Sequence, residues 1–322
     1  MVKKRLILIL ILFFALFLLT TALMFLRKDI YFWELRTRNN TVYMLGTIHV
    51  FKPELFDRID KRVFDAFYSC ELILNEKKPA LTMGRTYYEA ALYPHGDYLN
   101  HHIPENYYIE LKKILEENNL DIENYKQYRP FYFLDEMLKI SQIRYGFDEL
   151  INSGIDWYLL DKCMDRGIPW DGLEYFDSVY ELMEQEMPEA ETGYYLVGSV
   201  RSYFAEDSDC MTAVEEIIEG WMNGTIDSYK KNSKIIYVSY IGESNDAITV
   251  EINRYLNNVH TKRNLNMADT IEEYINSNEY NRIFVMAGVL HFLGEDSIIE
   301  ALKERGYKVK RIKKSFSWPF GL

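Results

Sequence analysis

Two stretches of the sequence decide the fold: Thr41-Val-Tyr-Met-Leu-Gly-Thr-Ile-His49 and Arg282-Ile-Phe-Val-Met-Ala-Gly-Val-Leu-His291. Each starts with an apolar, partly β-branched run of the kind found in buried strands. Each then ends in Gly-x-x-His, where the glycine permits backbone conformations that other residues avoid and the histidine can bind metal or carry protons. A single Gly-x-x-His is more often structural than functional, but two matched copies after two strands favour one shared site.

The residues around the first copy predict a compact unit. Tyr31–Arg36 and Thr41–Gly46 are rich in aromatic and β-branched residues and flank an Arg-Asn-Asn turn, which indicates an antiparallel hairpin. Apolar residues at helical spacing predict a helix over Phe56–Phe67, and Glu71–Glu76 reads as a short buried strand.

The C-terminal part repeats this order. A strand over Arg282–Ala287 leads into the second motif, an amphipathic helix is expected over Ser297–Arg305, and a strand over Tyr307–Ile312. The fold class is therefore α/β (α+β), with a mixed central sheet built from two strand/Gly-x-x-His/helix/strand units and flanked by helices. If the units are halves of one sheet, both loops can meet at one edge.

The middle of the chain, from about residue 79 to 240, has mostly helical patterns, with one strand-like interruption at Ile168–Glu174. No low-complexity linker separates it from its flanks, which favours a helical insertion over a separate domain. Residues 29–322 are therefore expected to form one domain.

Residues Leu6–Leu26 contain no charged side chain and are long enough to cross a bilayer as a helix. A cleaved signal peptide is the alternative, although its apolar region is usually shorter and no small-x-small cleavage site is evident. Lys3, Lys4 and Arg5 outweigh Arg27 and Lys28, so the positive-inside rule predicts a cytoplasmic N-terminus. Residues 1–28 are then a cytoplasmic tip and a single-pass anchor in the cell membrane, with the body extracytoplasmic.

The body is strongly acidic, since all 49 Asp and Glu residues but only part of the 37 Lys and Arg residues lie after the apolar segment. Nucleic acid is an unsuitable partner for such a surface, and membrane attachment depends on the helix itself. The three cysteines, Cys70, Cys163 and Cys210, form no Cys-x-x-Cys pair. One disulfide or buried thiols both fit this spacing, and the oligomeric state is left open.

Four blocks of the sequence, in this order, resemble the TraB/GumN family, which includes the pheromone-shutdown proteins and the membrane-tethered Tiki proteases. The first runs from Tyr43 through the first motif to Leu55 and continues with Glu71-Leu-Ile-Leu-Asn-Glu76. The others are Gly154-Ile-Asp-Trp-Tyr-Leu-Leu160 with Gly167-Ile-Pro-Trp-Asp-Gly-Leu-Glu174, then Arg263-Asn264 with Met267-Ala-Asp-Thr-Ile271, and finally Phe284 to Gly294 with Arg305-Gly-Tyr-Lys-Val309.

The resemblance implies a site made of both motif histidines, a glutamate and an arginine, which here are His49, His291, Glu76 and Arg263. Asn264 would support it, together with Gly46 and Gly288, and Glu174 is a second candidate carboxylate. In the Tiki branch such a site belongs to a divalent-metal-dependent protease, with manganese or cobalt favoured; zinc is the other metal considered.

The residue types suit that chemistry. Two neutral imidazoles and the Glu76 carboxylate can hold a divalent ion and leave positions for water. Arg263 can hold a substrate carboxylate or steady a tetrahedral oxyanion. Taken alone, Glu76 reads as a solvated strand end and Arg263 as a surface ion pair, so both assignments depend on the resemblance.

The leading functional hypothesis is a membrane-anchored, extracytoplasmic metal-dependent hydrolase acting on peptides or exported proteins. The alternative is a non-catalytic protein of the pheromone-shutdown type that binds a peptide signal, and a third hypothesis is action on a non-peptide ester or polymer. His95, His101, His102 and His260 lack a comparable strand context and are weaker candidates; the adjacent His101 and His102 could contact a metal, but a solvated loop is the favoured interpretation.

Overall fold

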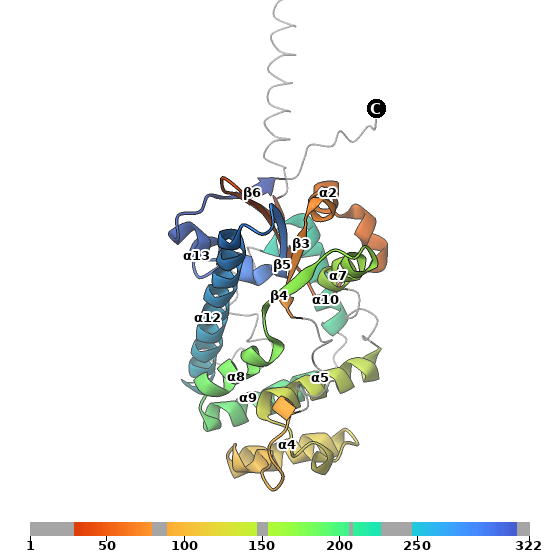
Figure 1. Cartoon of the computed structure of the whole chain (residues 1–322). Helices are drawn as coiled ribbons and strands as arrows, with labels where there is room; N and C mark the ends of the chain where they lie inside the picture. Colours follow the sequence, from red (N-terminus) through yellow and green to blue (C-terminus); the bar gives the residue numbers. More distant parts are fainter. Residues whose placement is uncertain (1–28, 79–88, 147–153, 206–208, 227–246, 314–322) are drawn as a thin grey trace, which may run out of the picture.

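The computed structural model describes residues 29–78, 89–146, 154–205, 209–226 and 247–313 (Figure 1). The described residues form a mixed α/β fold around a six-stranded sheet with the strand order β4-β3-β5-β2-β1-β6. The predicted mixed sheet flanked by helices is therefore confirmed. The expected membrane helix lies outside the described residues, and no helix among those described is long and apolar enough to cross a bilayer.

The predicted hairpin is formed by β1 (Asp29–Arg36) and β2 (Thr41–Thr47), which pair antiparallel with Phe32 opposite Leu45. The turn between the strands is closed by Thr37, whose backbone N–H donates to the Asn40 carbonyl at 2.9 Å. The Thr37 hydroxyl in turn accepts from the Asn40 backbone N–H at 2.9 Å. These local bonds fix the register of the hairpin and hence the face that each strand residue occupies.

The other strands are β3 (Leu72–Lys77), β4 (Trp170–Glu174), β5 (Arg282–Gly288) and β6 (Val309–Lys313). β5 lies between β2 and β3 and runs parallel to both, and β4 runs parallel to β3. The two predicted units are thus interleaved in one sheet. Their apolar runs are continuous because helices cover both faces of the parallel strands.

One predicted element differs from the structure. The helix expected over Phe56–Phe67 is split into a 3₁₀ helix, η1 (Pro53–Arg58), and α2 (Lys61–Ser69). Ile59 is extended between them, and Asp60 caps α2 by accepting a hydrogen bond from the Arg62 backbone N–H at 3.0 Å. The apolar spacing did not reveal this break, because the capping aspartate sits inside an otherwise periodic pattern.

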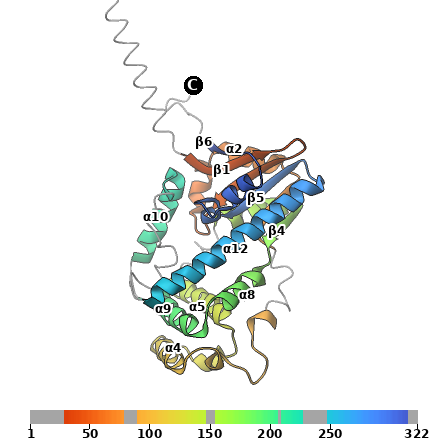
Figure 2. The same ribbon diagram turned by 90° about the vertical axis from the view of Figure 1, so that its left-hand side faces the viewer.

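Helices lie on both sides of the sheet: α12 (Ala247–Ser277) and α13 (Ile298–Glu304) on one side, α2 and α7 (Ile155–Asp165) on the other (Figure 1). The middle of the chain forms a second hydrophobic cluster, to which α12 also contributes. Its helices are α4 (Glu105–Glu117), α5 (Pro130–Tyr145), α8 (Phe176–Glu186) and α9 (Glu189–Tyr203). Since β4 leads directly into α8, the carboxyl edge of the parallel strands faces this helical cluster, and α12 spans both parts (Figure 2).

Cys70 and Cys163 are buried free thiols, so of the two arrangements left open the structure supports burial for this pair. Burial raises the pKa of Cys70 to about 12, which keeps its thiol protonated and unreactive at neutral pH.

Candidate functional site

Four neighbouring parallel strands end in residues that can carry chemistry. Glu174 is the last residue of β4, and Glu76 is the second-last residue of β3. β5 ends at Gly288 and continues into η6 (Val289–Phe292), which contains His291, while His49 follows the end of β2. In open α/β sheets, ligands bind beyond the carboxyl ends of the strands, so this edge is the candidate site.

Glu76 occupies the centre of this edge and is 7% exposed. One carboxylate oxygen accepts a hydrogen bond from Arg263 Nη2 at 2.8 Å, and the other accepts from the Gly288 backbone N–H at 2.8 Å. His291 Nε2 lies 3.7 Å from the first oxygen, and His49 Nε2 lies 3.9 Å from the second. The two motif histidines, separated by most of the chain, therefore face one carboxylate from its two sides.

The electrostatics favour an ionised Glu76. Burial opposes its charge, but the neighbouring His291, Arg263 and His49 hold the pKa of Glu76 well below its usual range. Burial lowers the pKa of His291, which favours a neutral imidazole at neutral pH. A neutral His291 has a lone pair available on one ring nitrogen.

Each motif histidine is oriented by a second side chain. Asp156, in the first turn of α7, accepts from His49 Nδ1 at 2.9 Å, and Asn264 Oδ1 lies 2.6 Å from His291 Nδ1. Because the Asn264 amide nitrogen donates to the Asp296 carbonyl, its oxygen faces His291 and accepts. Both rings therefore carry a proton on Nδ1 and turn Nε2 toward Glu76.

The His49 side chain is 59% exposed, whereas that of His291 is only 7% exposed. Partial burial of the His49 ring lowers its pKa, but the hydrogen bond to Asp156 and the negative charges of Asp156 and Glu76 raise it by more. Together they raise the pKa of His49 to about 9. His49 is therefore the solvent-facing and more basic of the two histidines.

Arg263 is bound between two carboxylates. Its Nε lies 3.1 and 3.2 Å from the two oxygens of Glu174, while Nη2 also reaches Glu76. Arg263 is 9% exposed. Arg263 thus bridges Glu76 and Glu174 in this structure, and its expected contact with a substrate stays a prediction. Burial raises the pKa of Glu174 and Arg263 opposes that rise, so the arginine helps both carboxylates to stay charged.

One face of α12 supplies three buried residues at the site, at helical spacing: His260, Arg263 and Asn264. The His260 ring stacks on the His291 ring with centroids 4.6 Å apart and an interplanar angle of 18°. Sequence reasoning assigned His260 no role because it follows no strand. Its position one helical turn before Arg263 and Asn264 was the signal that could have identified it.

Both motif glycines lie in close packing, which is tighter at Gly46 than at Gly288. Neither has a positive φ, so the expectation that they provide unusual backbone conformations is wrong. A Cβ on Gly46 would lie 2.9 Å from the Cα of Val289 in the second motif, and one on Gly288 would lie 3.3 Å from a Glu76 oxygen. The two motifs touch at Gly46, and Gly288 lets its own N–H approach Glu76.

Gly46→Ala is therefore expected to destabilise the protein by about 1–3 kcal/mol, as for overpacking of a tight core site. Chemical unfolding of the purified protein measures this change. Lys113→Ala is the control, because Lys113 is 74% exposed on α4 and its loss should change stability by less than about 0.5 kcal/mol. Equal stabilities of the two variants would contradict close contact between the motifs.

The remaining histidines lie elsewhere in the described chain. His95 is exposed, and His101 and His102 both bind Asp97, at 3.0 and 2.9 Å. Asp156 is the functional candidate that sequence reasoning missed. Asp156 belongs to the Gly154-Ile-Asp-Trp-Tyr-Leu-Leu160 block that resembles the family. Its place in that block was the sequence signal that could have identified it as a site residue.

Some of these residues suit a metal ion. Two ligands that each lie about 2.1 Å from one ion can be at most about 4.2 Å apart, and both histidine–Glu76 pairs meet that limit. In the part of the chain that the structure describes, no group of three or more His, Cys, Asp and Glu side chains already has the arrangement of a metal site. In this structure the two Glu76 oxygens accept hydrogen bonds from Arg263 and Gly288.

Comparison with known proteins places the chain in a family. The family model described as TraB/PrgY/gumN matches residues 31–311, which include every site residue described above. No curated protein and no solved structure matches the chain. Because the family match covers most of the 322 residues, the chain belongs to the TraB/PrgY/gumN family.

Proposed function

We propose that this protein is a membrane-anchored, extracytoplasmic, metal-dependent hydrolase that cleaves peptides or exported proteins. The observation that carries the proposal is the placement of His49 Nε2 and His291 Nε2 on the two sides of the buried Glu76 carboxylate. Two imidazole nitrogens and one carboxylate are the donor set of many catalytic divalent-metal sites.

His49, His291 and Glu76 would hold the ion, with manganese or cobalt preferred and zinc also compatible with the donors. When bound, the ion supplies an acidified water and polarises the scissile carbonyl. The protein's own contribution is orientation: Asp156 and Asn264 keep the two Nε2 atoms directed toward Glu76. Supporting hydrogen bonds of this kind fix the tautomer and the direction of a ligand histidine.

Arg263 and Glu174 position the central carboxylate in this proposal. Arg263 compensates the charge of Glu76 while that side chain is buried, and Glu174 fixes Arg263 by accepting three hydrogen bonds from it. A buried carboxylate without such a partner would take up a proton and lose its ability to bind a cation.

The proposal is tested with the purified full chain. It is incubated with manganese, cobalt or zinc, freed of unbound ion, and analysed for metal content and for cleavage of a mixed peptide library by mass spectrometry. We expect one ion per chain and new peptide ends, and His95→Ala, which alters an exposed histidine, should behave like the wild type. A protein that captures peptides without binding metal or cutting them would instead be a peptide-signal binding protein.

The location makes a separate prediction. Because Leu6–Leu26 is long, uncharged and preceded by three basic residues, an alkaline-phosphatase fusion at the C-terminus should be active and should remain in the membrane fraction. An inactive fusion, or a mature protein that begins after residue 20, would contradict the anchored extracytoplasmic arrangement.

Asp156→Ala should weaken metal binding by about 10- to 100-fold, because His49 loses the partner that fixes its tautomer. The affinity is measured by titration with cobalt in competition with a chelator. Asp161→Ala is the matched control, since Asp161 is an exposed aspartate on the same helix. Unchanged affinity in Asp156→Ala would remove Asp156 from the site while leaving the metal proposal intact.

A further inference from the structure

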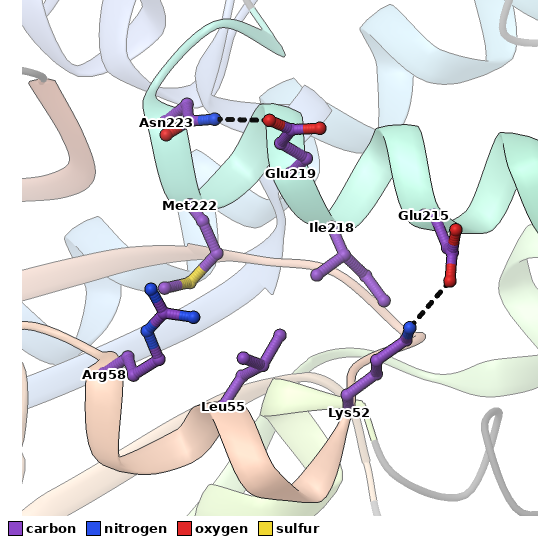
Figure 3. Close-up of a pocket in the computed structure, with 8 residues that line it drawn as sticks. All are labelled: Lys52, Leu55, Arg58, Glu215, Ile218, Glu219, Met222 and Asn223. Atoms are coloured by element: carbon purple, nitrogen blue, oxygen red, sulfur yellow. Dashed lines mark hydrogen bonds and ion pairs between the residues drawn. The ribbon is translucent and has the colours of Figure 1, made fainter.

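A pocket of about 480 Å³ lies outside the candidate site, between η1 and α10 (Asp209–Asn223) (Figure 3). That volume is within the range of pockets that bind small molecules. Its lining contains none of the residues that gather at Glu76; it is formed by Lys52, Leu55, Arg58, Glu215, Ile218, Glu219, Met222 and Asn223.

The two walls of the pocket are rows of side chains with matching spacing. A 3₁₀ helix has about three residues per turn, so Lys52, Leu55 and Arg58 form one row along η1. On α10, Glu215, Ile218 and Met222 form the opposing row at i, i+3 and i+7. Figure 3 shows the rows pointing toward each other, with Leu55 and Ile218 in the middle.

The two rows carry opposite charges that pair at one end of the pocket but not at the other. Lys52 Nζ donates to Glu215 at 2.8 Å, and this bond raises the pKa of Lys52 and lowers that of Glu215. At the other end, Arg58 faces the uncharged Met222 (Figure 3). Among the residues that the structure describes, the Arg58 side chain has no hydrogen bond or ion pair, whereas the nearby Glu219 already accepts from the Asn223 amide.

We propose that this pocket binds a small carboxylate that carries an apolar group. The carboxylate would pair with the Arg58 guanidinium, which offers two parallel donors to such an anion. The apolar group would cover Leu55, Ile218 and Met222, which line the space beside it. Both the end of a peptide with an aliphatic last residue and a short fatty acid have this chemistry.

The pocket is connected to the candidate site without being part of it. Trp221 of α10 donates its indole N–H to the Gly46 carbonyl at 2.8 Å and packs against Phe51 with ring centroids 5.7 Å apart. The wall formed by α10 is therefore fixed to the first Gly-x-x-His segment. The proposed ligand site is argued from the residues that line the pocket, so it does not depend on metal binding or hydrolysis at Glu76.

The test is calorimetric titration of the purified full chain with N-acetyl-leucine, N-acetyl-leucine amide and octanoate. We expect a carboxylate to bind and the amide, which lacks the charge, to bind at least about tenfold more weakly, as loss of a charge-assisted hydrogen bond implies. Binding of N-acetyl-leucine would indicate a peptide end, and binding of octanoate alone would indicate a fatty acid.

Two substitutions and a control make the test specific. Arg58→Gln should reduce carboxylate affinity by about tenfold or more, whereas Arg58→Lys, which keeps the charge but not the two parallel donors, should give an intermediate affinity. Arg36→Gln, which removes a 70% exposed arginine outside the pocket, should change nothing. The proposal is overturned if neither carboxylate binds, or if Arg58→Gln binds as tightly as the Arg36→Gln control.

Discussion

Glu76→Gln is expected to abolish metal binding and peptide cleavage together. Glutamine has the shape of glutamate but no charge, and its amide nitrogen would face the Gly288 N–H that now donates to a Glu76 oxygen. The substitution thus removes the charge of the carboxylate that both motif histidines face. The loss of affinity should exceed the roughly 100-fold that removal of a supporting contact costs, because a direct ligand is lost.

Metal content, cobalt affinity and peptide cleavage are measured on the same preparation, with unfolding by denaturant as a check on the fold. Glu116→Gln is the control, because Glu116 is an exposed glutamate on α4 and carries no part of the site. If Glu76→Gln keeps the metal and the activity of the wild type, Glu76 is not a ligand. If only the activity falls, its role is in proton transfer or substrate positioning.

Much of the sheet was predictable because its signals are local in sequence. The apolar runs before Gly46 and Gly288 mark strands whichever way the rest of the chain folds. Two matched motifs after such strands then place His49 and His291 at carboxyl ends, and in parallel strands these ends share one edge. The strand order was not predictable, because β5 is inserted between β2 and β3 only through pairing across most of the chain.

The residues that hold the motif histidines and Glu76 in place were less predictable, because they lie on helices. His260 and Asp156 gain their roles from the way α12 and α7 pack beside the sheet, and a helix can turn any of its faces inward. The same applies to Arg263, for which the sequence suggested a partner in the substrate. Its observed partners, Glu76 and Glu174, lie nearly two hundred and about ninety positions away in the chain.

This bridge gives Arg263→Met a large expected effect on stability. Methionine keeps much of the length of arginine but leaves Glu76 and Glu174 buried without their cation. Removing one partner of a buried ion pair typically costs about 3–5 kcal/mol, because the remaining charge is uncompensated. Arg254→Met is the control: Arg254 lies on the same helix, is 58% exposed and pairs with Glu251, and loss of such a surface pair costs at most about 1 kcal/mol.

The pH dependence distinguishes this cause from a simple packing defect. In the wild type the pKa of Glu76 is lowered on folding, so its contribution to stability is present above its unfolded pKa and is lost as the pH falls through the folded value. Without Arg263, burial raises the pKa of Glu174 further above its unfolded value, because Arg263 is the main group that opposes that rise. Glu76 loses one of the three groups that lower its pKa but keeps His291 and His49. The deficit of the variant relative to the wild type should therefore be largest at neutral pH and should shrink as acidification protonates Glu174. Urea unfolding at a series of pH values from about 7 down to about 5, with a chelator present, measures this difference. A deficit that stays constant over that range would mean that Arg263 stabilises the protein by packing and that the two carboxylates do not depend on its charge.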